Sequence, residues 1–152
     1  MQLEIRKVDE RDLMLIFEWA NDNAVRAQSF NLERISLEEH EKWFRKKIAD
    51  LDCFFYIIRK DSKPLGQARF DLIKDVSTIS YSVSKEFRGM GHGKELLKIS
   101  IDEFKKECSS YKTFHAKVKS ENIASKRIFT DLGFSLSKKY DGNGLLYILN
   151  KK

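Results

Sequence analysis

The residues with the clearest potential for chemistry are the glycines of segment 88–93, which reads Arg-Gly-Met-Gly-His-Gly. The segment falls between an expected strand and an expected helix, where glycines let the backbone turn sharply and bring consecutive N–H groups close to a ligand. The dipole of the following helix adds a field that favours a pyrophosphate. The segment therefore predicts an anion site, and the alternative is a tight connection that binds nothing.

Two common phosphate loops do not fit this segment. A Walker-type loop needs glycine at position 88 and serine or threonine at position 95, where the sequence has Arg88 and Glu95. The dinucleotide fingerprint G-x-G-x-x-G also fails, because Gly89, Gly91 and Gly93 are evenly spaced. What remains is the pattern R-x-x-G-x-G at the head of a helix.

Two segments resemble one known family. Residues 83–93, Val-Ser-Lys-Glu-Phe-Arg-Gly-Met-Gly-His-Gly, resemble the acetyl-coenzyme A signature of the GNAT N-acetyltransferase superfamily. Residues 120–134 carry E-N-x-x-S, then Arg-Ile-Phe and Leu-Gly-Phe, and resemble a later helix of that family. This form of the helix resembles the branch of ribosomal-protein N-terminal acetyltransferases. The resemblance is firm over the C-terminal half of the chain and looser over the N-terminal half.

The resemblance implies acetyl-CoA as co-substrate and no metal. In the family the loop amides hold the pyrophosphate, an asparagine matching Asn122 contacts the pantetheine arm, and a splayed strand points the N–H of Val83 at the thioester carbonyl. The residues that it implies for the cofactor are Tyr81, Ser82, Val83, Arg88, Gly89, Met90, Gly91, His92, Gly93, Lys94, Asn122, Ser125 and Phe129.

Acetyl transfer to an amine needs a neutral nucleophile, a stabilised oxyanion and a proton for the departing thiolate. Many relatives take that proton from a tyrosine at the position of Phe129, which has none to give. The E-N-x-x-S form assigns the role to Ser125, our candidate acid; alternatively, Ser125 only bonds the cofactor or its own helix. The strand carboxylate that serves some relatives as base falls on Lys117.

Histidine is the side chain best suited to act as a base near neutral pH. His40 and His115 are therefore considered, and His40 is the candidate catalytic base. His40 also occupies an apolar helical stripe, so a packed histidine is the alternative. His92 lies inside the glycine-rich segment, where contact with the cofactor is expected instead.

The acceptor pocket in this superfamily is built largely by the first two helices and their connection, here residues 19–43. That region resembles acetyltransferases of nucleotide-linked amino sugars, including those of pseudaminic acid synthesis. Arg26, Ser29 and Phe30 are the candidate substrate-binding residues, because an arginine and aromatic rings suit a diphosphate and a sugar or base ring. The alternative for the aromatic residues is that they cover the core. The expected acceptor is a primary amine, for instance of a nucleotide amino sugar; a protein N-terminus and a non-catalytic acyl-CoA-binding module are the alternatives.

The elements that must position these residues follow a mixed order. The patterns predict strands over 2–8, 53–59, 65–73, 78–83, 113–118, 134–139 and 145–150, and helices near 9–20, 36–48, 91–108 and 122–131. A loop carries Arg26, Ser29 and Phe30, and a turn covers 61–64. We expect an α+β, GNAT-like single domain over residues 1–152, with a mixed, mostly antiparallel, twisted sheet of about six to seven strands and about four helices.

Composition limits the partners. The 152 residues include 29 basic and 23 acidic side chains, a formal charge of +6, but the basic residues are scattered, which favours a solvated surface over nucleic-acid binding. Cys53 and Cys108 form no C-x-x-C pair, so we expect no disulfide framework, no zinc site and a cytoplasmic protein. No stretch suits a targeting or membrane segment, and a monomer or a homodimer is expected.

Overall fold

Strands and helices follow one another in a mixed order along residues 2–140 and 142–152, which are the part of the chain that this computed structural model describes. Two short 3-10 helices, Glu10–Asp12 and Lys85–Phe87, precede α1 and α4. The other elements are β1 (Leu3–Lys7), α1 (Leu13–Ala20), α2 (Asn23–Ala27), α3 (Leu37–Ala49), β2 (Cys53–Lys60), β3 (Lys63–Ile73), β4 (Val76–Val83), α4 (His92–Glu107), β5 (Thr113–Lys119), α5 (Ile123–Asp131), β6 (Ser135–Tyr140) and β7 (Gly144–Asn150).

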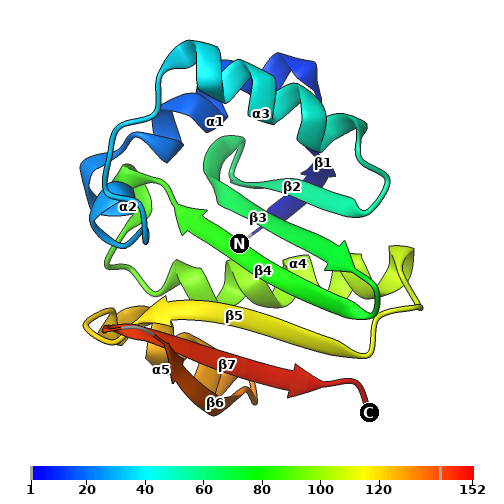
Figure 1. The fold of residues 1–152 in the computed structure, drawn as a ribbon. Helices are drawn as coiled ribbons and strands as arrows, with labels where there is room; N and C mark the ends of the chain where they lie inside the picture. Colours follow the sequence, from blue (N-terminus) through cyan, green and yellow to red (C-terminus); the bar gives the residue numbers. More distant parts are fainter. Residues whose placement is uncertain (1, 141) are drawn as a thin grey trace.

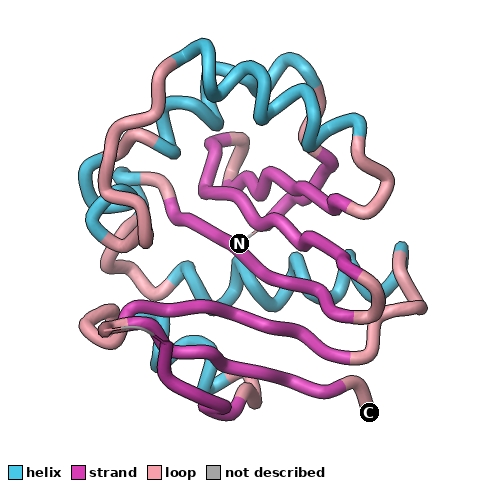
Figure 2. The backbone as a smooth tube through the Cα atoms, viewed as in Figure 1, coloured by secondary structure: helices cyan, strands magenta, loops and turns pink. Residues whose placement is uncertain are grey.

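One seven-stranded sheet has the order β1-β2-β3-β4-β5-β7-β6 among the described residues. Its neighbouring strands are antiparallel except for β4 and β5, which are parallel. Helices α1 and α3 lie over the N-terminal strands, whereas α4 and α5 lie behind the sheet in Figures 1 and 2. The predicted α+β class and the mixed, mostly antiparallel sheet are confirmed.

The apolar sequence of β2 shows why helices cover both of its faces. Phe55 and Ile57 point to one side and pack in a cluster with Ile16 and Phe44 from α1 and α3. Tyr56 and Ile58 alternate with them and belong to the larger core around α4 on the other side. A strand buried on both faces needs such a continuous apolar run, since successive side chains point in opposite directions.

The sheet opens between β4 and β5. Their parallel pairing covers three residue pairs, from Val76 with Thr113 to Thr78 with His115. Beyond that point β4 stays paired with β3 as far as Val83, while β5 stays paired with β7. The two central strands therefore diverge toward their carboxyl ends, which is the splay that the family resemblance implied.

Two local predictions were wrong. The expected loop around Arg26 contains α2, because the Asp22 carboxylate accepts hydrogen bonds from the N–H groups of Ala24 and Val25 and so begins a helical turn. The expected four-residue turn at 61–64 is a two-residue turn, since β3 already begins at Lys63. Its residues Asp61 and Ser62 both have positive φ angles, as the tightest hairpin connections require.

No helix within the described residues is both long enough and apolar enough to cross a membrane.

Candidate active site

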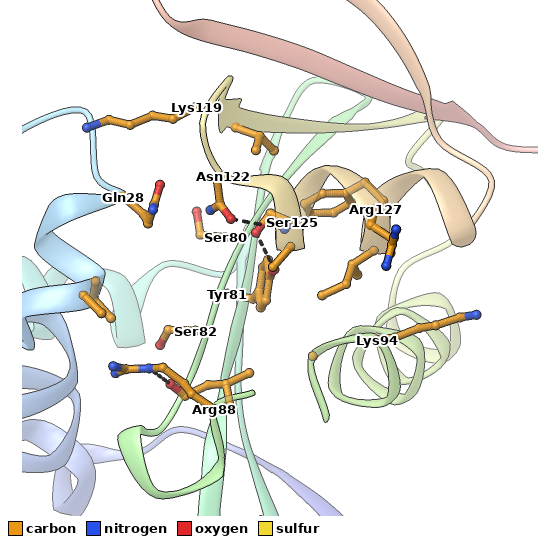
Figure 3. A pocket seen from close by; sticks show the side chains of 18 of the residues that line it. Gln28, Ser80, Tyr81, Ser82, Arg88, Lys94, Lys119, Asn122, Ser125 and Arg127 are labelled. Carbon is orange, nitrogen blue, oxygen red and sulfur yellow. Dashed lines mark hydrogen bonds between the residues drawn. The ribbon is translucent and has the colours of Figure 1, made fainter. Parts of the chain in front are cut away.

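A cavity of about 840 Å³ lies where β4 and β5 diverge, and we call it the cofactor cavity. Residues of β4, the glycine-rich segment, the end of β5, α5 and α2 line it, as Figure 3 shows for part of the set. The structure brings together on this cavity every residue that the sequence assigned to the cofactor, with one exception. Met90 does not line the cavity, and its side chain is 64% exposed.

The structure requires glycine at the three positions of the segment for different reasons. Gly89 and Gly91 have φ angles of 76° and 81°, and Gly91 is the N-cap of α4. A Cβ on either of them would meet no atom within 4 Å, so the backbone angle and not space requires glycine there. At Gly93, a Cβ would lie 2.7 Å from Ile128 Cδ1, so glycine lets α4 approach α5. The start of α4 is thus free of side chains on its open side.

Five basic side chains line the cofactor cavity, against one acidic side chain, Asp131, among the described residues. They come from the glycine-rich segment, α4, the end of β5 and α5: Arg88, Lys94, Lys117, Lys119 and Arg127. Lys94 and Arg127 extend on neighbouring helices in Figure 3. An excess of positive charge beside open helix amides favours a polyphosphate ligand.

Helix α2 is tied to both sides of this cavity. Arg88 Nη2 lies 2.6 Å from Asp22 Oδ1 at the start of α2, and Arg88 Nε donates to Val83 O at 3.1 Å. At the other end of α2, Lys119 Nζ donates to Ala27 O at 3.0 Å. Burial acts against ionisation of Asp22, but hydrogen bonds from Val25 N–H and Arg88 outweigh it and lower its pKa. Arg88 and Lys119 therefore hold α2 across the gap between β4 and β5.

The backbone of β4 presents N–H groups to this gap. Ser84 N donates to Leu65 O on β3, so the backbone groups of Ser84 face β3. Because these groups alternate in direction along a strand, those of Val83 and Tyr81 face the opposite edge, where β5 has diverged. The Arg88 bond to Val83 O on that edge agrees with this assignment. The strand register therefore directs the Val83 N–H into the gap between β4 and β5.

A pair of hydrogen-bonded hydroxyl groups lines the cofactor cavity. Tyr81 Oη lies 2.5 Å from Ser125 Oγ, and Figure 3 shows the two side chains pointing toward each other from β4 and α5. Asn122 Oδ1 accepts the Ser125 N–H at 3.2 Å and caps α5. The Phe129 ring packs edge-on against Tyr81, with 5.9 Å between centroids. Position 129 lacks a hydroxyl, but the neighbouring Tyr81 supplies one to this cavity.

Burial raises the pKa of Tyr81, and the hydrogen bond with Ser125 only partly opposes that rise. The tyrosine therefore keeps its proton at neutral pH. The family resemblance implied Tyr81 for the cofactor, but we did not predict the contact of its hydroxyl with Ser125. Strand alternation was an available signal, because alternate residues of a strand such as Tyr81 and Val83 share one face.

A second cavity of about 460 Å³ lies on the other side of β4, and we call it the acceptor cavity. Helices α1, α2 and α3 with strands β3 and β4 enclose it. The two cavities meet, since five residues line both of them: Val25, Ser29, Ser80, Tyr81 and Ser82.

The predicted substrate residues divide between the two cavities. Arg26 lines the acceptor cavity and Ser29 lines both cavities, whereas Phe30 lines the cofactor cavity and is 54% exposed. Arg26 donates hydrogen bonds to the carbonyls of residues 20, 31 and 33 and to Ser29 Oγ. Ser29 Oγ in turn donates to Val25 O at 2.7 Å. Arg26 and Ser29 thus shape the wall of the acceptor cavity.

The imidazole of His40, the candidate base, is buried and makes a hydrogen bond within the protein. His40 is buried among the rings of Phe17, Trp43 and Phe44, and its Nε2 lies 2.9 Å from Leu13 O and must donate to it. Burial lowers the His40 pKa, and the bond to Leu13 O only partly opposes this, so His40 lines the acceptor cavity as a neutral ring.

The other two histidines lie apart from the acceptor cavity. His92 is buried against the Phe87 ring, with Nε2 3.4 Å from Lys60 Nζ. His115 on β5 is not among the described residues that line either cavity. Neither histidine is among the described residues that line the acceptor cavity.

The residues that line the acceptor cavity and that we did not assign to a substrate include Glu39, Trp43, Gln67 and Arg69. Two of them lie on β3, directly opposite β4: Gln67 pairs with Ser82 and Arg69 with Ser80. Their side chains also bond, with Gln67 Nε2 3.1 Å from Ser82 Oγ and Arg69 Nη2 3.3 Å from Ser80 Oγ. No signal in the sequence marks Gln67 and Arg69, because their contacts depend on pairing with the neighbouring strand and not on a local motif.

Comparison with known proteins agrees with this geometry. A family model described as "Acetyltransferase (GNAT) domain" matches residues 2–135. No curated protein sequence matches significantly.

Many solved structures share the fold at low sequence identity. Spermidine N-acetyltransferase from Vibrio cholerae, in complex with CoA and spermine, matches with a TM-score of 0.85 at 17% identity, over 98% of this chain and 95% of that one. A domain from Methanocaldococcus jannaschii matches at 0.84 and 23%, over 99% of each chain. Ribosomal-protein-alanine N-acetyltransferase from Brucella melitensis matches at 0.78 and 21%, over 97% and 98%.

Proposed function

This chain belongs to the GNAT acetyltransferases, which use acetyl-CoA, and we propose that it acetylates the primary amine of a small molecule held in the acceptor cavity. One observation carries the proposal: the two cavities meet at Ser80, Tyr81 and Ser82 of β4. A thioester that enters from one side and an amine that enters from the other reach the same stretch of strand. Such an arrangement brings the reactants together without exposing the acetyl group to bulk water.

The cofactor cavity supplies the groups that a thioester needs. The amides at the start of α4 and the basic side chains around them suit the pyrophosphate. The Val83 N–H, directed into the gap, is placed to bond the carbonyl oxygen as it gains negative charge. Asn122 Oδ1 caps α5, and its Nδ2, which has no hydrogen-bond partner among the described residues, is our proposed donor to the pantetheine arm.

The Tyr81–Ser125 pair is our proposed proton donor. The amine nitrogen attacks the carbonyl carbon, the bond from carbon to sulfur breaks, and the thiolate takes a proton from this pair. Either hydroxyl can pass the proton, since the two oxygens share one hydrogen bond. The amine loses its own proton into the acceptor cavity, where Glu39 is the carboxylate among the described lining residues.

The size of the acceptor cavity supports a compact acceptor, because about 460 Å³ is within the range of small-molecule sites. A nucleotide amino sugar remains our specific candidate, although Arg26 spends its hydrogen bonds on its own loop and is a weak ligand for a diphosphate. Residues 1–152 would form one catalytic domain, since one sheet lines both cavities. The two free cysteines suit a cytoplasmic enzyme.

Acetylation of a protein N-terminus is the second candidate. The E-N-x-x-S helix favours it, as does the fold shared with ribosomal-protein-alanine N-acetyltransferase. The ties from Arg88 and Lys119 to α2 argue against it, because they narrow the access that a peptide chain would need. The paired hydroxyls argue against a module that only binds acyl-CoA.

Two variants test the proton donor. Tyr81→Phe and Ser125→Ala should each lower kcat by about 100-fold, the usual range for loss of an acid, while the Kd for acetyl-CoA changes little. The double variant should be hardly slower than the worse single variant, because the two groups act as a unit. Release of CoA thiol with amino sugars, peptides and polyamines as acceptors measures both the rate and the acceptor class.

Tyr140→Phe is the matched control, since Tyr140 is a tyrosine of β6 that is not among the described lining residues of either cavity. Its kcat should equal that of the wild type. Unchanged turnover in Tyr81→Phe and Ser125→Ala would remove the pair from the mechanism, and no thiol release with any amine would refute the proposed function.

A further inference from the structure

One guanidinium in the acceptor cavity has no part in the proposed reaction, and we propose that it binds an anionic group of the acceptor. The substrate is then a small amine that also carries a carboxylate or a phosphate, and the residue that recognises it is Arg69. This inference rests on the proposed function, because it names the chemical class of the molecule in the acceptor cavity.

The Arg69 side chain is fixed in place by its neighbours. Nε donates to Asp71 Oδ2 at 2.8 Å, and Nη2 donates to Ser80 Oγ at 3.3 Å. The guanidinium carbon lies 5.0 Å from the centroid of the Trp43 ring and 5.7 Å from that of Phe55. Two aromatic rings and two hydrogen bonds therefore set the orientation of the guanidinium plane.

The remaining edge of this guanidinium is available to a ligand. Among the described residues, no hydrogen-bond partner of Nη1 is found, and the side chain is 22% exposed while it lines the acceptor cavity. An arginine that is already oriented loses little conformational freedom when it binds a planar carboxylate or a phosphate. The Arg69 Nη1 edge is thus a preformed donor site.

Asp71 does not cancel the charge of Arg69. Lys47 Nζ lies 2.8 Å from the other oxygen of that carboxylate, so two cations share one anion. Burial opposes ionisation of Asp71, but Arg69 and Lys47 outweigh it and lower the pKa, which keeps the carboxylate charged. The cluster carries a net charge of +1 at neutral pH.

The rest of the lining keeps this positive balance. Arg26 and Arg69 line the acceptor cavity, and Glu39 is the one acid among the described lining residues. A polyamine would meet repulsion in such a site, whereas an amine with an anionic group would gain an ion pair. The charge of the cavity thus favours the second class.

The position of Arg69 also sets the size of the acceptor. Arg69 is opposite Ser80, and Gln67 is opposite Ser82, next to the proposed oxyanion donor Val83. Alternate residues of a strand lie about 7 Å apart on one face. An anion at Arg69 and an amine near Ser82 would be separated by about that distance, which a compact molecule can span.

Matched pairs of amines test this inference. Glucosamine 6-phosphate is compared with glucosamine, and 5-aminopentanoate with 5-aminopentanamide, so that each pair shares its amine and differs in the anion. Spermidine represents acceptors that are only cationic. The wild type should favour at least one anionic member over its partner by about tenfold or more in kcat/KM, as expected for a charged hydrogen bond. The pair that shows the preference tells phosphate from carboxylate.

Arg69→Met should remove that preference, lowering kcat/KM for the anionic member by about tenfold while leaving its partner and the KM for acetyl-CoA unchanged. Arg69→Lys should keep part of the preference. This variant also tests the inference if the methionine variant does not fold. Arg45→Met is the control, because Arg45 is exposed on α3, pairs with Glu41 and is absent from the described lining residues. It removes one positive charge and should leave the preference intact.

Calorimetry with the CoA-loaded protein gives a second measure that needs no turnover. Tighter binding of an anionic member in the wild type, lost in Arg69→Met, supports the inference. Equal binding within every pair, no binding of any pair, or a preference for spermidine overturns it. Acetylation of amines regardless of an anion would refute only this inference, whereas a failure to acetylate any amine would refute the proposed function.

Discussion

The two cavities that meet at β4 are built in different ways. The cofactor cavity relies on backbone N–H groups, which a positive φ at Gly91 and the divergence of β4 from β5 leave open. The acceptor cavity relies on side chains from separate elements, with His40 and Trp43 on α3 and Arg69 on β3. A site made of backbone depends on one local strand-turn-helix unit, but a site made of side chains exists only after the sheet and helices have assembled.

The largest effect is expected where the backbone site is blocked. Gly91→Glu places a negative side chain beside the proposed pyrophosphate and forces a residue with a Cβ to adopt a φ of 81°. The affinity for acetyl-CoA should fall by at least about 100-fold, because both charge and backbone strain oppose binding. Calorimetry measures this loss.

Gly142→Glu is the matched control for this change. Gly142 lies in the turn between β6 and β7, has a φ of 68°, and like Gly91 would give a Cβ open space. The same strain and the same charge should leave acetyl-CoA affinity unaltered there. If both variants bound the cofactor as the wild type does, the backbone amides of α4 would not be its site.

A smaller effect separates two roles of Asn122 in the cofactor cavity. Asn122→Ala removes the cap of α5 and should lower the free energy of unfolding by about 1 kcal/mol. Asn122→Asp keeps a capping oxygen and should retain that stability, but it loses the amide donor proposed for pantetheine. Denaturant unfolding and the KM for acetyl-CoA, measured on both variants, give the two answers. A normal KM in Asn122→Asp would limit the residue to capping.

The smallest effect is expected from His40, a side chain of the acceptor cavity, which should make the stability of the protein depend on pH. Burial lowers the pKa of folded His40 below 6.5, so the unfolded chain binds the proton more readily. The wild type should therefore lose stability as the pH falls below 6.5, toward the folded pKa. His40→Gln, which can still donate to Leu13 O, should lack this contribution. Parallel unfolding curves for the two proteins between pH 8 and pH 5 would show that His40 does not titrate this way.

The comparison also explains what the sequence could predict. Strand and helix periodicity predicted the sheet, and the two motifs predicted the cofactor cavity, because each is a local pattern. Helix α2 was missed, since five residues after the cap Asp22 leave too little periodicity to see. Arg69 was missed because it is one of 29 basic residues and its role comes from Trp43 and Asp71.

The sequence assigned two residues to the cofactor without predicting that they contact each other. Tyr81 and Ser125 were both assigned to the cofactor, but they are 44 positions apart, and their hydrogen bond depends on how α5 packs against β4. Arg26 was expected to bind substrate, but its guanidinium bonds backbone carbonyls. The sequence alone does not distinguish such an arginine from one that faces a ligand.

The most direct test is a crystal structure of the protein with bound acetyl-CoA. We predict the pyrophosphate at the amides that begin α4, the thioester oxygen within hydrogen-bonding distance of Val83 N, and the sulfur next to the Tyr81 and Ser125 hydroxyls. The acetyl group should point toward the acceptor cavity. A thioester located away from the gap between β4 and β5 would contradict the account.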